Sequence, residues 1–215
     1  MTVPDLTAPD PTRRLILLAH APTRAQRDAI FAPATEPAEE AGLAQAGHWA
    51  EARALRKVGQ LLTAPEDRAR QTAATLASTL GMEMREDAAL ADLDAGGWQG
   101  HSLAELSVHE ADAVAAWLGD PEARPHGGES LAQLRTRVAR WLEHGTAEGH
   151  TLAVTHPAVI RMAVAVALDA PLQAFWRLDI APLSLTDLRW NRRWTVRATG
   201  VDAREFGQAP TSRAK

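Results

Sequence analysis

The sequence predicts an α/β fold, a three-layer α/β/α sandwich around a mostly parallel mixed sheet. Short apolar strands alternate with segments of helical pattern along the chain, which is typical of a parallel sheet covered by helices on both faces. Two of these strands, residues 14–19 and 151–155, are runs of mainly branched or small apolar residues. Such runs are expected for strands buried on both faces.

Length and composition favour one soluble domain. The 215 residues fit a single domain, predicted at residues 13–200, with a proline-containing disordered leader (1–12) and a polar tail (201–215). The net charge of −4 gives no general attraction to nucleic acid or to an anionic membrane. The absence of cysteine excludes disulfides and thiolate chemistry. No segment resembles a signal peptide or a membrane span, so a cytoplasmic protein is expected.

Glycine and proline punctuate the first half of the chain. Residues 24–40 are rich in alanine, proline and glutamate and predict an extended surface loop. Pro65 suits the first position of a helix, and Glu66 and Asp67 suit its first turn, where acids stabilise the helix. Gly81 predicts its end. The predicted elements are strand 14–19, loop 24–40, helix 39–57, strand 60–63, helix 65–80 and strand 82–85.

The second half carries equally local signals. Three glycines within residues 92–101 mark a loop with special backbone angles. Ser102 and Glu105 form the pattern of a capping box and predict a helix start. The dipeptide Asn191-Arg192 predicts a hairpin. The predicted elements are helix 102–118, loop 121–128, helix 129–144, strand 151–155, helix 158–168 opened by Pro157, and strands 183–188 and 194–198.

Two core strands end in histidine, and this pattern points to a site. His20 and His156 each follow a strand and precede a helix start. Ligands bind at the carboxyl ends of strands in open α/β sheets, and helix N-termini favour anions. Arg68 lies at another helix start, and Asp92 and Asp94 lie in the glycine-rich loop. Taken alone, His20 is more simply interpreted as a buried structural histidine.

Together these residue types suit phosphoryl transfer. A neutral imidazole can attack phosphorus, and arginine binds phosphate oxygens through two parallel hydrogen bonds. A protonated carboxyl group can donate to the leaving oxygen. Metal ligation by His20, Asp92 and His156 is the alternative, but their spacing does not match a zinc pattern. No metal and no other cofactor is expected.

Six motifs, in order over about residues 14–190, resemble those of the histidine phosphatase superfamily, also called phosphoglycerate mutase-like. The resemblance implies that fold and a metal-independent reaction on phosphomonoesters. The motifs are Ala19-His20-Ala21-Pro22-Thr23, Leu43-Ala44-Gln45-Ala46-Gly47, Arg68-Ala69-Arg70-Gln71-Thr72-Ala73, Leu90-Ala91-Asp92 with Gly96-Gly97-Trp98-Gln99-Gly100, Gly127-Gly128-Glu129-Ser130, and Val154-Thr155-His156-Pro157-Ala158-Val159-Ile160-Arg161.

The resemblance also implies residue roles. His20 matches the nucleophile that becomes a phosphohistidine, and Asp92 matches the general acid. His156 matches the second catalytic histidine, whereas Arg68 and Thr23 match phosphate-binding positions. The implied activity is hydrolysis of a small phosphorylated metabolite, with neither nucleic acid nor membrane as a partner.

The chain departs from the family pattern around the nucleophile. Ala19 stands where the family has a phosphate-binding arginine, Ala21 and Pro157 stand where it has glycine, and Asp92 is shorter than the usual glutamate. A weakened or inactive phosphatase-fold protein with a ligand-binding or regulatory role is therefore the alternative hypothesis.

Several neighbours are secondary candidates. Arg24 and Arg27, one turn beyond His20, are possible replacements for the missing guanidinium, although exposed loop arginines are the simpler interpretation. A mutase is disfavoured because the sequence shows no other basic set for a second phosphate. His126 is a possible pocket residue, and Glu129 is expected to start a helix and orient a pocket residue.

Overall fold

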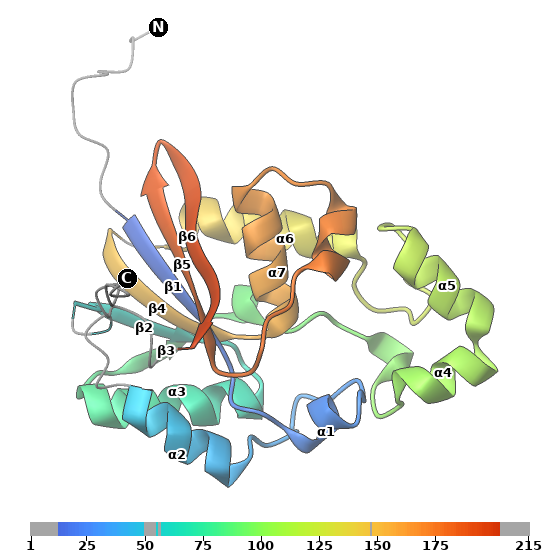
Figure 1. The fold of residues 1–215 in the computed structure, drawn as a ribbon, viewed down its shortest axis with the longest axis horizontal. Coiled ribbons are helices and arrows are strands. Elements are labelled where there is room, and N and C mark those ends of the chain that lie inside the picture. Colours follow the sequence, from blue (N-terminus) through green and yellow to red (C-terminus); the bar gives the residue numbers. More distant parts are fainter. Residues whose placement is uncertain (1–12, 50–54, 56, 147, 203–215) are drawn as a thin grey trace, which may run out of the picture.

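The computed structural model describes residues 13–49, 55, 57–146 and 148–202, which form a six-stranded sheet flanked by helices (Figure 1). The strand order is β3-β2-β4-β1-β5-β6. The pairs β3–β2, β2–β4 and β4–β1 are parallel, whereas β1–β5 and β5–β6 are antiparallel. The predicted α/β sandwich with a mostly parallel mixed sheet is therefore confirmed.

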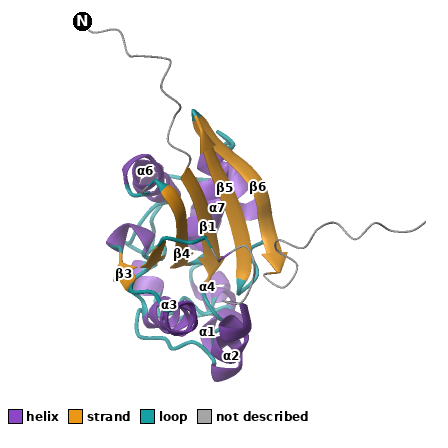
Figure 2. Ribbon diagram, turned by 90° about the vertical axis from the view of Figure 1, so that its left-hand side faces the viewer, coloured by secondary structure: helices purple, strands orange, loops and turns teal. Residues whose placement is uncertain are grey.

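The elements follow the predicted alternation of strand and helix (Figure 2). Figure 1 shows α2 and α3 packed together on one side of the sheet, and α6 and α7 together on the other. The strands are β1 (Arg13–Ala19), β2 (Gln60–Thr63), β3 (Met84–Glu86), β4 (Gly149–Thr155), β5 (Ser184–Asn191) and β6 (Arg193–Asp202). The α-helices are α1 (Arg24–Arg27), α2 (Glu40–Trp49), α3 (Asp67–Leu80), α4 (Leu103–His109), α5 (Ala111–Gly119), α6 (Leu131–His144) and α7 (Pro157–Ala167). Short 3₁₀ helices span Ala88–Leu90 (η2), Gly96–Trp98 (η3) and Leu172–Arg177 (η4).

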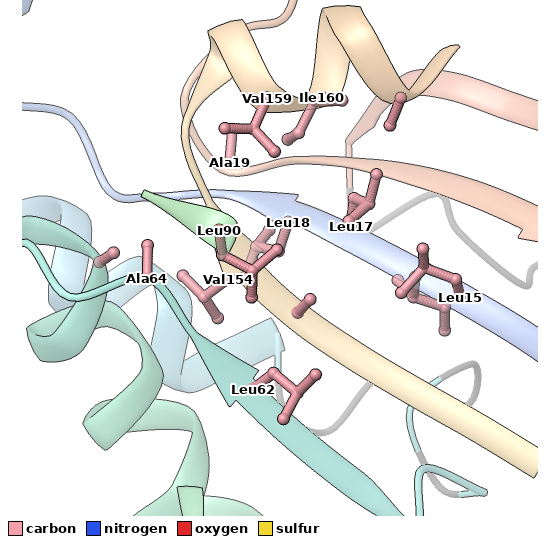
Figure 3. Close-up of a cluster of buried hydrophobic side chains, with 14 of the residues drawn as sticks. Leu15, Leu17, Leu18, Ala19, Leu62, Ala64, Leu90, Val154, Val159 and Ile160 are labelled. Atoms are coloured by element: carbon pink, nitrogen blue, oxygen red, sulfur yellow. The ribbon is translucent and has the colours of Figure 1, made fainter. Parts of the chain in front are cut away.

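Strand β1 is central and aligns the two histidines. Its apolar run lies in the hydrophobic core, where Leu15, Leu17 and Leu18 appear among side chains from β2, β4 and α7 (Figure 3). Ala19 at the end of β1 is in register with Thr155 at the end of β4. The backbone N–H of His20 also donates to the carbonyl of Thr155, with N and O 2.9 Å apart. Two neighbouring parallel strands therefore deliver His20 and His156 to the same edge of the sheet.

Three predicted helix boundaries are wrong. Helix α3 begins at Asp67 and not at Pro65, and the side chain of its N-cap residue, Glu66, makes no cap hydrogen bond. The predicted helix 102–118 is two helices, because Glu110 has non-helical angles (φ −133°, ψ 42°). Its carboxylate accepts a hydrogen bond from Nε1 of Trp98, a tertiary contact that holds the break. Helix α6 is capped by Ser130, so Glu129 precedes the helix.

Other predicted segments either contain an additional element or extend beyond the described residues. The predicted loop 24–40 contains the single turn α1, which Thr23 caps. Helix α2 is described to Trp49, and residues 50–54 and 56 of the predicted helix 39–57 lie outside the described residues. Strand β6 runs to Asp202, into the predicted tail, and residues 1–12 and 203–215 lie outside the description. In the described part of the chain, no helix has the length and hydrophobicity that a membrane span requires.

Candidate active site

A cavity of about 430 Å³ opens at the edge of the sheet where β1 and β4 end. It is lined by four of the residues predicted for the site: His20, Thr23, Arg68 and Asp92. His156 is fully buried directly behind them, with its ring centroid 5.1 Å from that of His20. The fold therefore brings together all five side chains that the sequence assigned to catalysis or phosphate binding.

The hydrogen bonding of His20 determines its tautomer. Its Nδ1 lies 2.7 Å from the carbonyl oxygen of Ala21, which can only accept a hydrogen bond, so Nδ1 carries the proton. Nε2 is then left with a free lone pair. Burial, together with the neighbouring charges of His156 and Arg68, lowers the pKa of His20 from its ordinary value of 6.5 to about 3. His20 is thus a neutral imidazole near pH 7, the form that a nucleophile requires.

Arg68 and His156 are held by one carboxylate. Nη2 of Arg68 donates to Oδ2 of Asp92 at 2.8 Å, and Nδ1 of His156 lies 3.3 Å from the same oxygen. Burial alone would raise the pKa of Asp92, but the charges of His156 and Arg68 outweigh it and hold this pKa below its ordinary value. The ionised carboxylate of Asp92 therefore lies between the side chains of Arg68 and His156.

Glu66 is a site residue that sequence reasoning missed. Its Oε2 lies 2.7 Å from Nε2 of His156, and its Oε1 accepts the backbone N–H of Asp92 at 3.0 Å. Burial would raise the pKa of Glu66, but its hydrogen bond and charge interaction with His156 lower it. The sequence pattern predicts this acid only as a helix-start residue. Its place two residues before Arg68 and close after β2 is the signal that could have assigned it to the site.

A second ion pair supports the loop that carries Asp92. Nη1 of Arg137 donates to the carbonyl oxygens of Ala89 and Ala91, both at 2.9 Å, and Nη2 donates to that of Asp92 at 3.3 Å. Glu129 holds Arg137 through two hydrogen bonds, of 2.9 and 2.6 Å. Glu129 therefore acts on the site through Arg137, a residue that the sequence analysis did not single out.

Thr23 reaches the cavity from the start of α1. Its Oγ1 accepts the backbone N–H of Gln26 at 3.1 Å, and its side chain is almost completely buried. A hydroxyl group that accepts one hydrogen bond can still donate another. Thr23 thus combines a capping role with a donor position at the cavity wall.

Neither Arg24 nor Arg27 replaces the missing guanidinium, so this suggestion from the sequence is wrong. The side chain of Arg24 is exposed and lies 3.5 Å from Asp28, and that of Arg27 is exposed and lies 2.7 Å from Glu39. Neither residue lines the cavity. Both are solvated surface arginines because α1 directs them away from the site.

Ala19 offers no cation either. It is fully buried in the hydrophobic core, where Figure 3 shows it next to Val159. The other two departures follow the two histidines directly. The N–H of Ala21 already donates to Oγ1 of Thr72 at 3.0 Å, and Pro157 lines the cavity without an N–H group to offer. Among the arginines that the sequence analysis proposed for the site, Arg68 lines the cavity and Arg24 and Arg27 do not.

His126 is not a pocket residue. Its Nδ1 accepts the N–H of Gly128 at 3.0 Å, and its ring packs against Trp98 with centroids 5.1 Å apart. It does not line the cavity. Packing against the tryptophan and the hydrogen bond to the loop explain its burial. Among the residues that the structure describes, no group of three or more histidine, aspartate or glutamate side chains is placed to hold a metal ion.

A buried neutral histidine, an arginine, a second histidine and a carboxylate at the ends of parallel strands define a phosphoryl-transfer type of site on an α/β sheet. The chain also matches the histidine phosphatase superfamily (branch 1) over residues 15–201. It is 32% identical over 181 residues to a bifunctional protein of Mycobacterium tuberculosis, a match that covers 81% of this chain and 50% of that protein. The protein studied here belongs to the histidine phosphatase superfamily.

Solved structures agree with this family. The vanadate complex of a mycobacterial glucosyl-3-phosphoglycerate phosphatase superposes with a TM-score of 0.75 and 26% identity, covering 88% of this chain and 100% of that one. A putative α-ribazole-5'-P phosphatase from Escherichia coli has a TM-score of 0.77 at 21% identity, covering 88% and 98% of the two chains. The chain spans about half the length of the first curated relatives it matches.

Proposed function

We propose that this protein hydrolyses phosphomonoesters of small metabolites through a phosphohistidine on His20, without a metal. The observation that carries the proposal is the tautomer of His20, a residue that lines the cavity, because the 2.7 Å contact of Nδ1 with the Ala21 carbonyl leaves the lone pair of Nε2 free to act as a nucleophile. Relatives named as phosphatases support the same reaction class, including a putative phosphoserine phosphatase of Hydrogenobacter thermophilus that is 25% identical over 181 residues.

The reaction has two steps. Nε2 of His20 forms a bond to phosphorus while the ester P–O bond breaks, and the leaving oxygen takes a proton from the carboxyl group of Asp92. Water then attacks the phosphohistidine and gives its proton to the Asp92 carboxylate. The P–N bond breaks, which releases inorganic phosphate and restores the neutral imidazole.

Asp92 must leave its resting position for this role. In the free protein its Oδ2 occupies the place between Arg68 and His156 where a phosphate oxygen would bind. A bound phosphate takes over both contacts and removes the charges that keep the pKa of Asp92 low. The negative charge of the bound phosphate raises this pKa, so the displaced carboxyl group can hold a proton for the leaving oxygen.

The test is turnover of an aryl phosphate between pH 4 and 8, together with alkaline trapping of labelled phosphoenzyme. We expect the wild type to turn over and to form one labile phosphohistidine per chain. His20→Ala should lose about a thousandfold of kcat or more and form no phosphoenzyme. The exposed His109 provides the matched control, since His109→Ala should behave as the wild type. Turnover that survives His20→Ala would disprove the mechanism.

A binding role on the same scaffold is the second candidate. One observation favours it: Glu66 and Asp92 place two carboxylates within reach of His156, and Ala19 supplies no cation to offset them. The same experiment separates the candidates. A wild-type protein that binds inorganic phosphate but forms neither product nor phosphoenzyme would support the binding role.

A further inference from the structure

The cavity is larger than a phosphate group requires. A water molecule accounts for about 30 Å³ of liquid, and a tetrahedral anion occupies the space of only a few waters. The cavity measures about 430 Å³. Most of its volume therefore lies beyond the histidines and is available to the group that the phosphate esterifies.

That remaining volume is bounded by aromatic rings from three separate segments. Phe31 comes from the loop after α1, Trp117 from α5, and Phe175 and Trp176 from η4. We call these four residues the aromatic wall.

The rings of the wall support one another. The centroids of Trp117 and Trp176 are 4.7 Å apart, and Phe31 lies 5.7 Å from Trp117. Phe175 and Trp176 are 4.9 Å apart at an interplanar angle of 90°. These are edge-to-face contacts, which aromatic pairs prefer. The wall is thus formed before a ligand arrives, which reduces the entropic cost of binding.

Arg161 on α7 gives this end of the cavity a hydrogen-bond donor. Its guanidinium lies over Phe175, 5.8 Å from the ring centroid. Within the described residues its Nε is buried without a hydrogen-bond partner, and the nearby charges of Asp179 and Asp92 favour its charged form. Because Arg161 lines the cavity, its guanidinium can donate a hydrogen bond to an acceptor on a ligand that fills it.

The charges of the cavity limit what else the ligand can carry. Three carboxylates line it, from Glu66, Asp92 and Asp94, against the two guanidinium groups of Arg68 and Arg161. Arg68 is already paired with Asp92 at 2.8 Å. A ligand with several phosphates would meet more negative than positive charge. The aromatic wall instead favours a flat apolar body with one acceptor group.

We propose that the cavity binds a phosphate monoester of a flat aromatic alcohol, with the ring against Trp117 and Trp176 and an acceptor group on Arg161. The proposal deepens the proposed function, since it names the class of ester on which His20 would act. Its binding part does not depend on turnover and is tested separately.

The probes are three phosphonates whose C–P bond cannot be hydrolysed by this mechanism, with affinities measured by isothermal titration calorimetry. Benzylphosphonate and cyclohexylmethylphosphonate differ in the flatness of the ring, and 4-carboxybenzylphosphonate adds an acceptor. We expect the benzyl compound to bind about fivefold more tightly than the cyclohexyl one. The carboxylate should add about another tenfold, the range of a hydrogen bond to a charged group.

Variants of the protein assign each preference to its residue. Trp176→Leu should abolish the preference for the flat ring, and Trp176→Phe should retain it, which separates ring loss from misfolding. Arg161→Met should abolish the gain from the carboxylate. Trp190→Leu on β5 and Arg177→Met are the matched controls, because neither residue lines the cavity, and both should keep the wild-type order of affinities.

Equal affinity for the flat and the saturated ring, or a carboxylate gain that survives Arg161→Met, would overturn the proposal, as would failure of all three phosphonates to bind. Failure of the hydrolase proposal has a different signature. A protein that binds the phosphonates in the expected order but releases no phosphate from benzyl phosphate retains the aromatic site and loses the proposed reaction. Hydrolysis of benzyl phosphate without any preference for the flat ring would support the proposed reaction and overturn the proposed aromatic site.

Discussion

The histidine end and the aromatic end of the cavity are organised in different ways. At the histidine end, Arg68, Asp92 and Glu66 each have a charged or hydrogen-bonding partner, with contacts of 2.7 to 3.0 Å. At the aromatic end, ring contacts predominate, and the Nε of Arg161 has no hydrogen-bond partner in the described part of the chain. One end of the cavity is occupied by the protein's own groups, and the other is open.

This difference matches the separation that we propose between the reaction at His20 and the selectivity for the esterified group. The histidine end is built where adjacent strands finish, so the sheet itself sets the positions of His20 and His156. The aromatic end is assembled from α5, η4 and a loop, segments that the sheet does not align. Loops and caps are the parts of a fold that accept change most readily. We therefore expect substitutions at the two ends to have separable effects.

The largest expected effect comes from removing the carboxylate that occupies the histidine end. Asp92→Asn should lower kcat by about 10² to 10⁴, the usual contribution of a general acid. It should also tighten binding of inorganic phosphate about tenfold, because Arg68 and His156 no longer hold an internal anion. Steady-state kinetics and calorimetry measure the two effects.

Asp94→Asn is the control, because it removes a cavity carboxylate that is not bound to Arg68. If it tightens phosphate binding equally, through-space charge and not displacement of Asp92 is responsible.

The next effect tests whether one guanidinium holds the phosphate. Arg68→Met should reduce kcat/KM by about 10² to 10³, comparable to the loss of a preorganised oxyanion donor. Arg70 lies on the same helix but is half exposed and paired with Asp67, so Arg70→Met is the control and should leave kcat/KM unchanged. An unaffected Arg68→Met enzyme would mean that another group binds the phosphate.

A pH effect on stability should also arise at the histidine end. The pKa of His20 is about 3 in the folded protein, below its ordinary value of 6.5, so the unfolded chain binds more protons between these values. Stability should therefore fall as the pH decreases from about 6.5 toward 3. In His20→Gln this part of the decrease should disappear. Thermal melts of both proteins at pH 4.5 and 7.5 provide the comparison, and equal shifts in Tm would show that His20 does not contribute.

The smallest effect is expected outside the cavity, where Trp98 packs against Trp117 of the aromatic wall. Glu110→Ala removes the acceptor of the Trp98 Nε1 hydrogen bond, which is 3.0 Å long, and should cost about 1 kcal/mol of unfolding free energy. Activity should change little, since neither residue lines the cavity. Urea denaturation measures the stability change. A loss of activity without a loss of stability would contradict this separation.

The sequence by itself determined the features that depend on near neighbours. The apolar run of β1, the capping box of Ser102 and Glu105, and the left-handed Gly81 at the end of α3 (φ 64°) were all predicted and are present. The positions of His20 and His156 after strands were equally readable, because parallel strands finish at a common edge.

Only the tertiary structure decided which other side chains join the histidines. Glu66 contacts His156 across 90 residues of sequence, and Arg137 supports the carbonyl of Asp92 across 45. It also turned Arg24 toward solvent and packed His126 against Trp98. These outcomes depend on the packing of distant segments, which no local pattern of residues encodes. The aromatic wall has the same origin, since its rings meet only when α5 and η4 pack against each other.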